Sequence, residues 1–133
     1  MNYFLDTNIC IYFLKGFFPN IKKKIEEIPP HSIKIASIVK AELLFGVQNS
    51  SRKKNNLELV NRFLLPFEII PFDDPATDVY SKIRFDLSKN GKIIGPNDLI
   101  LASTVLANKG ILVSNNLNEF SRIKNLKVEN WSK

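Results

Sequence analysis

Three acidic residues stand among apolar neighbours, where no basic residue is placed to pair with them. Asp6 ends an apolar opening segment, Glu42 lies inside the stretch Ala41–Val47, and Asp98 precedes an apolar run. On a helix only residues three and four positions apart meet, and around Glu42 none of these is basic. Burying an unpaired carboxylate costs roughly several kcal/mol. The three carboxylates therefore need a cation from another part of the molecule.

Each of these acids, taken alone, has a simpler explanation. Asp6 could cap a helix. Glu42 could pair with a distant basic residue or lie on a solvent-exposed stripe of its helix, and Asp98 could interact favourably with the dipole of the helix that it begins. One shared site explains all three, because Mg²⁺ takes oxygen ligands and bridges to phosphates. A metal held in this way activates water for attack on a phosphodiester. The pattern predicts a metal-dependent nuclease whose metal ligands and catalytic residues are Asp6, Glu42 and Asp98.

The charge balance favours a polyanionic partner. The 133 residues include 19 Lys and Arg against 13 Asp and Glu, a net charge of +6. A basic domain of this kind is typical of nucleic-acid binding, although single basic runs are usually solvated helix faces. We expect RNA to be bound by four of these residues: Arg52, Lys53, Lys54 and Lys92.

The sequence argues against several other classes of protein. The single cysteine, Cys10, lies in an apolar run and is expected to be buried and inert. His31, the one histidine, follows two prolines in a predicted loop, which makes Ser-His-Asp or Cys-His catalysis improbable. One cysteine excludes an internal disulfide, consistent with a cytoplasmic protein. No apolar run approaches the roughly 20 residues that span a membrane, and the length suits one domain, residues 1–133.

Alternation of short apolar strands with helices predicts an α/β fold. Strands are expected at 2–6, 33–36, 68–70, 111–114 and 127–129, and helices at 8–16, 20–28, 37–49, 53–65, 76–89 and 96–109. Ser37 is expected to cap its helix, and Leu57, Val60 and Leu64 to face inward from theirs. Such alternation indicates a parallel sheet covered by helices on both faces. The carboxyl ends of the strands then share one edge, where sites in open α/β sheets lie.

Four segments resemble, in order, the four motifs of PIN-domain proteins: 3–8, 37–43, 94–102 and 112–120. The resemblance runs from the first residues to Glu129-Asn130-Trp131, and the length suits the VapC-type toxins of bacterial toxin–antitoxin pairs. It implies a three-layer sandwich with a central parallel sheet of about five strands. It also implies an endoribonuclease that depends on Mg²⁺ or Mn²⁺.

The resemblance also assigns supporting residues. The metal-binding acids of the family map onto Asp6, Glu42 and Asp98, and its fourth acidic position maps onto Asn116. Asn116 offers a neutral amide oxygen, which predicts weak binding of a second ion. Ser114 matches a hydroxyl near the metal, and Glu119 is an acid close by without an assigned role as a direct ligand.

VapC-type similarity further implies a homodimer, an antitoxin that blocks the acidic pocket, and cleavage of an RNA such as a tRNA anticodon loop, which inhibits translation.

Two alternative functions remain. One is an inactive PIN-like module that binds RNA or protein without cutting. The other is a phosphatase-like domain, which often carries a second Asp two residues after the first; here that position is Asn8, which we count among the supporting polar residues.

Overall fold

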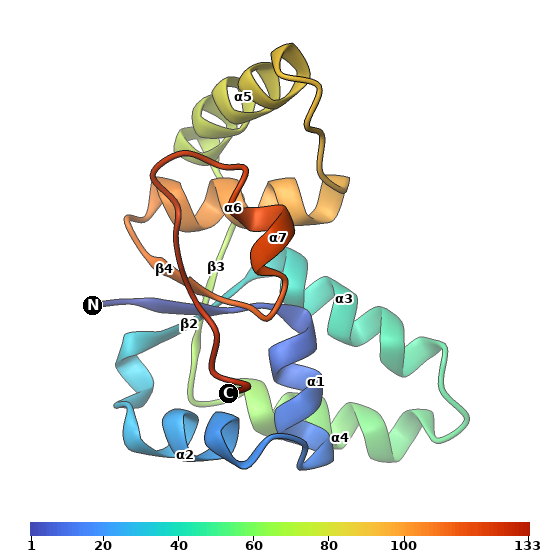
Figure 1. Ribbon diagram of the computed structural model, residues 1–133. Helices are drawn as coiled ribbons and strands as arrows, with labels where there is room; N and C mark the ends of the chain where they lie inside the picture. Colours follow the sequence, from blue (N-terminus) through green and yellow to red (C-terminus); the bar gives the residue numbers. More distant parts are fainter.

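Five short parallel strands form one twisted sheet at the centre of the protein. The computed structural model describes residues 1–133. The strands are β1 (Tyr3–Leu5), β2 (Ile33–Ala36), β3 (Glu68–Ile70), β4 (Ile111–Val113) and β5 (Lys127–Glu129). Their order across the sheet is β3-β2-β1-β4-β5, and every neighbouring pair is parallel (Figure 1). The first strand is therefore the central one, and the predicted parallel α/β sheet is confirmed.

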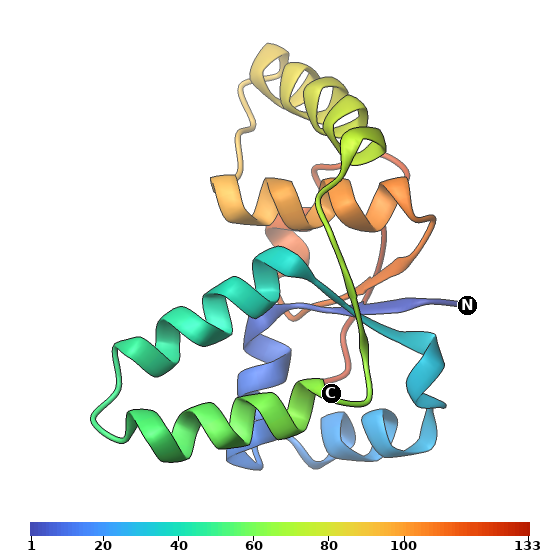
Figure 2. The same cartoon turned by 180° about the vertical axis from the view of Figure 1, so that it is seen from behind.

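Helices cover both faces of this sheet. They are α1 (Thr7–Lys15), α2 (Pro19–Glu27), α3 (Ser37–Gln48), α4 (Lys53–Leu64), α5 (Asp74–Lys89), α6 (Pro96–Ala107) and α7 (Leu117–Phe120), with a 3₁₀ turn at Pro30–Ser32. In Figure 1, α5, α6 and α7 lie above the sheet, while α1, α2 and α4 lie below it. The view from behind shows α3 and α4 extending together as a hairpin away from the sheet (Figure 2). The result is the three-layer arrangement expected from the sequence.

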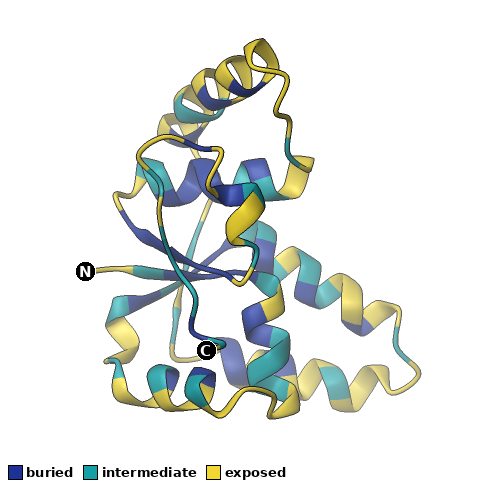
Figure 3. Ribbon diagram, viewed as in Figure 1, coloured by how far each residue is buried: buried dark blue, intermediate teal, exposed yellow.

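The core lies on both sides of the central strands. Phe4, Leu5 and the whole of β4 are buried, and α6 is buried along most of its length (Figure 3). The carboxyl ends of β1 and β4 lead directly into polar residues, Asp6 and Ser114. None of the helices combines the length and the apolar character that crossing a bilayer would require.

Several local predictions need correction. Ser37 is the first residue of α3, so its side chain does not cap the helix, and Ala36 occupies the preceding position. Leu57 is 41% exposed, because the buried face of α4 is formed by Val60, Phe63 and Leu64. The helix expected from residue 76 begins earlier, at Asp74, since the side chain of Asp73 accepts a hydrogen bond from the backbone N–H of Ala76.

Candidate functional site

Four carboxyl groups meet at the carboxyl edge of the sheet. Asp6 follows β1, Glu42 lies on α3, Asp98 in the first turn of α6, and Glu119 on α7. Each is close enough to feel the others' charge: Glu42 and Glu119 both raise the pKa of Asp6, and Asp6, Glu119 and Glu42 all raise that of Asp98. The structure therefore brings together the three acids singled out from the sequence, and it adds Glu119.

Asp6 is held by two donors. Its Oδ1 accepts the backbone N–H of Thr7 at 2.7 Å, so Asp6 does cap α1. Its Oδ2 accepts the hydroxyl of the buried Ser114 at 2.8 Å. The pKa of Asp6 is raised, chiefly by burial and further by the neighbouring acids, although both hydrogen bonds oppose the rise. The helix cap and the acidic site are thus two roles of one side chain.

Glu42 is half-buried and has polar partners without a positive charge. The Thr7 hydroxyl donates to its Oε1 at 2.7 Å, and the amide of Asn97 donates to its Oε2 at 3.4 Å. The one salt bridge of the protein joins Lys34 and Glu68, far along the sheet from this site. The distant basic residue that could have neutralised Glu42 is therefore absent.

Asp98 and Glu119 form a pair that shares a proton. The pKa of Asp98 is raised to about 7, first by burial, then by its hydrogen bond to Glu119 and by the charges of the other acids. Burial also raises the pKa of Glu119, but hydrogen bonds with Asp98, Gly95 and Asn116, and the charge of Arg122, outweigh it and lower the pKa overall. Below neutral pH, Asp98 is therefore the member of the pair that tends to hold the proton.

Asn116 occupies the position of the fourth acid of the PIN-domain pattern, and in this structure it forms a hydrogen bond with Glu119. Its Nδ2 donates to Oε2 of Glu119 at 3.2 Å, and its backbone N–H donates to the hydroxyl of Ser114 at 3.0 Å. The backbone N–H of Gly95 holds the other oxygen of Glu119 at 3.2 Å. The signal available in the sequence was spacing: Glu119 lies three residues after Asn116, and one turn of α7 brings the two together.

The chemistry of this donor set fits a hard divalent cation. Its members are carboxyl oxygens, with no nitrogen or sulfur ligand beside them, and no Lys or Arg forms an ion pair with any of them. Clustered carboxylates repel one another, and without a cation one of them tends to hold a proton, as Asp98 does. No three of these groups already converge closely enough to enclose an ion. A cation would take the place of the proton, because ligands must be deprotonated to bind.

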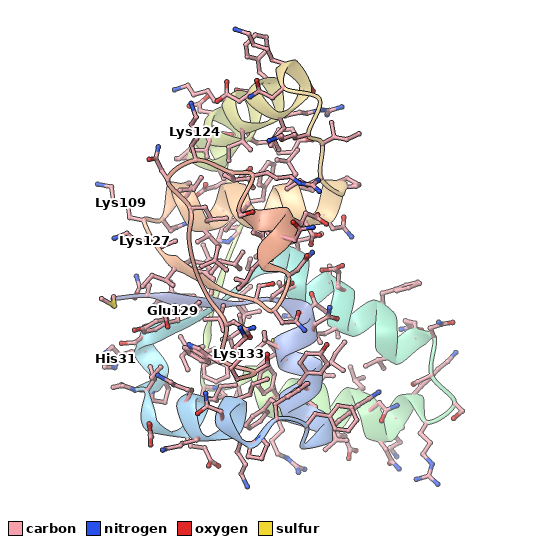
Figure 4. The ribbon with its side chains drawn as sticks, in the orientation of Figure 1. His31, Lys109, Lys124, Lys127, Glu129 and Lys133 are labelled. Atoms are coloured by element: carbon pink, nitrogen blue, oxygen red, sulfur yellow. The ribbon has the colours of Figure 1, made fainter.

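The remaining residues considered from the sequence lie elsewhere. Asn8 is exposed in α1 and its side chain makes no hydrogen bond. Arg52, Lys53 and Lys54 lie where α3 turns into α4, whereas Lys92 lies in the loop between α5 and α6. Cys10 is buried and its thiol pKa is raised by burial, as expected of an inert side chain. His31 precedes β2, at the opposite edge of the sheet from the acids (Figure 4).

Comparison with known proteins places these observations in a family. A model of the PIN domain matches residues 3–126. "Ribonuclease VapC2" of Rickettsia felis is 42% identical over 134 residues and covers all of both chains. "tRNA(fMet)-specific endonuclease VapC" of Salmonella typhimurium is 30% identical over 98% of each chain. A crystal structure of VapBC2 from Rickettsia felis bound to a promoter DNA fragment superimposes with a TM-score of 0.93 at 42% identity, covering 98% of this chain and 99% of the other.

Proposed function

Because this chain belongs to the PIN-domain family and matches VapC ribonucleases over its full length, we propose that it is a Mg²⁺-dependent endoribonuclease and the toxin of a toxin–antitoxin pair. The observation that carries the proposal is a cluster of four carboxyl groups in which no Lys or Arg forms an ion pair with any member. Such a cluster is costly unless it serves to bind an ion.

In this proposal Asp6, Glu42, Asp98 and Glu119 hold the ion, which is Mg²⁺ or, alternatively, Mn²⁺. When bound, the metal activates water and neutralises charge on the phosphate that is attacked. Ser114 and Thr7 fix the orientation of the Asp6 carboxylate, and Thr7 also orients Glu42. Asp98 gives up its proton on metal binding, after which Glu119 keeps its place through Gly95 and Asn116.

The proposed substrate is a tRNA, cut in its anticodon loop so that translation stops. The support is the name of the Salmonella relative, a tRNA(fMet)-specific endonuclease that aligns over 98% of each chain. The net charge of +6 favours such a polyanion, because cationic surfaces attract phosphates over a Debye length.

The proposed partners are a cognate antitoxin and a second copy of the chain. A VapBC2 structure superimposes on this chain with a TM-score of 0.93, which supports an antitoxin partner. In this proposal the antitoxin blocks the acidic site. A large apolar side chain, Phe45 on α3, is 69% exposed and would be covered in a dimer.

The test is cleavage of an initiator tRNA transcript by purified protein. The native protein is assayed with Mg²⁺ and with EDTA, and the Asp98→Asn variant is assayed with Mg²⁺. We expect cleavage only by the native protein with metal. Stoichiometric binding of the transcript without any cleavage in Mg²⁺ or Mn²⁺ would instead identify an inactive RNA-binding module. Cleavage that persists in EDTA, or in purified Asp98→Asn protein, would contradict the metal site.

A further inference from the structure

Two adjoining hollows between α5, α6 and the segment around α7 are lined by basic side chains. The larger one, of about 510 Å³, lies between α5, the end of α6 and the segment after α7; its basic residues are Lys82, Lys89, Arg122 and Lys124, and its one acid is Asp86. The smaller one, of about 370 Å³, lies between the α5–α6 loop and α7. It is lined by Lys92 together with Asn118, Ser121 and, again, Arg122.

Arg122 joins the two hollows and fixes their relative position. It belongs to the wall of both, and its guanidinium donates to the backbone carbonyl of Ile93 at 2.9 Å, which ties the segment after α7 to the α5–α6 loop. Two residues beyond Ile93, Gly95 donates its N–H to Glu119. The strip formed by Lys82, Lys89, Lys92, Arg122 and Lys124, called here the basic strip, therefore leads to the acid cluster at its Glu119 side.

The four lysines of the basic strip are free to meet a ligand, while Arg122 is held by the carbonyl of Ile93. All five side chains are exposed, and none forms a salt bridge within the protein. Even Asp86, which stands four residues after Lys82 on α5, is not within ion-pair distance of it. Figure 4 shows Lys124 beside α5, in keeping with the shared wall of the larger hollow. Five exposed cations against one carboxylate make a surface suited to successive phosphates.

We propose that the basic strip is the path of the RNA backbone as it leaves the acid cluster. The inference rests on the proposed ribonuclease function and names the surface that its substrate follows. The lining of the larger hollow is compatible with it, because the apolar side chain of Val79 on α5 is partly exposed among the basic residues. Phosphates would meet the lysines along its rim.

This path differs from the surface expected from the sequence. Arg52, Lys53 and Lys54 lie at the outer end of the α3–α4 hairpin, ten residues and more along the chain from Glu42 (Figure 2). Neither of the two basic hollows includes any of them. Lys92 alone, among the four residues predicted to bind RNA, belongs to the basic strip.

The test measures binding of a fluorescein-labelled 20-nucleotide polyuridine by anisotropy over a range of salt concentrations. The protein carries Asp98→Asn, and EDTA is present, so cleavage does not interfere. In this background three variants are compared: Lys89→Ala/Lys92→Ala/Lys124→Ala on the strip, Lys22→Ala/Lys23→Ala/Lys24→Ala on α2 as a control of equal charge, and Arg52→Ala/Lys53→Ala/Lys54→Ala. Melting curves verify that each variant folds.

For single-stranded RNA, each lost phosphate contact reduces the slope of log K against log salt by about 0.7. With three lysines removed, the slope of log K against log salt for the strip variant should therefore be shallower by about 2, and binding at 0.1 M salt roughly 100-fold weaker. The α2 control should keep the native slope. An unchanged slope for the strip variant overturns the inference. That result is expected if this surface binds an acidic protein segment and not RNA. Failure of the native protein to cut any RNA would refute the proposed function while leaving this binding result to stand.

Discussion

The hydroxyl of Thr7 lies 2.7 Å from Oε1 of Glu42. The backbone N–H of the same residue lies 2.7 Å from Oδ1 of Asp6. One residue thus orients two carboxylates that stand 36 positions apart in the chain, and it does so without adding charge to the site. Groups that orient metal ligands in this way typically change metal affinity or activity when they are lost.

Removal of the Thr7 hydroxyl should weaken metal binding. We expect Thr7→Val, which keeps the shape but not the donor, to raise the Mg²⁺ concentration for half-maximal cleavage by about 10- to 100-fold. Thr7→Ser keeps the hydroxyl and should stay within a few-fold of the native protein. Equal loss in both variants would mean that the methyl group matters and the hydrogen bond does not.

Glu119 should matter more than Asn116. Glu119→Gln removes one of the negative charges that attract the ion, so we expect a much larger Mg²⁺ requirement. Asn116→Ala removes only one donor to Glu119, and about a tenfold effect is expected. A Mg²⁺ titration of cleavage ranks the two variants. The reverse order would place Asn116, not Glu119, at the ion.

Metal binding should depend on pH through the proton of Asp98. Since the pKa of Asp98 is raised to about 7 in the metal-free protein, Mg²⁺ must displace that proton below neutral pH. Affinity measured by calorimetry should rise as pH increases from 6 to about 8, with proton release that is largest at the acid end. Affinity that is flat over this range would mean that Asp98 is already ionised.

The same shift affects the stability of the metal-free protein. A carboxyl group whose folded pKa exceeds its unfolded pKa binds more protons when folded, so its contribution to stability is lost as pH rises from about 4 to about 7. Asp98→Asn is neutral at every pH. In EDTA it should therefore melt above the native protein at pH 8, with a smaller difference at pH 5. Native protein that melts higher at both pH values would contradict the shared proton.

Gly110 should tolerate no side chain. A Cβ there would lie 2.5 Å from Cε1 of Phe4, a buried residue of β1. We expect Gly110→Ala to reduce the free energy of unfolding by about 1–3 kcal/mol. Gly46→Ala is the matched control, because a Cβ at that helical position meets no atom within 4 Å and should stabilise by about 0.5–1 kcal/mol. Urea denaturation of both variants measures the difference.

Much of this architecture follows from local patterns. The strand at 33–36 and those at 68–70 and 127–129 were predicted with the bounds that the structure has, because each is a short apolar or alternating run between breaks. Placing Asp6, Glu42 and Asp98 together required only that parallel strands share a carboxyl edge. Their clustering could be inferred since each acid stood among apolar residues with no local cation.

Other features of the fold and the site depend on tertiary contacts, which cannot be predicted from the sequence pattern alone. The helix α7 has four residues, too few for a periodic pattern, so the orientation of Glu119 toward Asp98 was not predictable from it. Leu57 matched the apolar period of α4, but it lies in the first half of that helix, toward the outer end of the α3–α4 hairpin, and is 41% exposed. The basic strip joins α5 to the segment after α7, two regions whose meeting is set by the tertiary fold.

The bond between Ser114 and Asp6 spans 108 positions of the chain. Closing so long a loop has an entropic cost, which the pairing of β1 with β4 and the core packed around it offset, and contacts of such high sequence separation slow folding. A molecule in which β1 and β4 are not paired has Asp6 and Ser114 apart, and with them the arrangement of the acids. Cleavage activity should therefore appear during refolding only when this central pair of strands has formed.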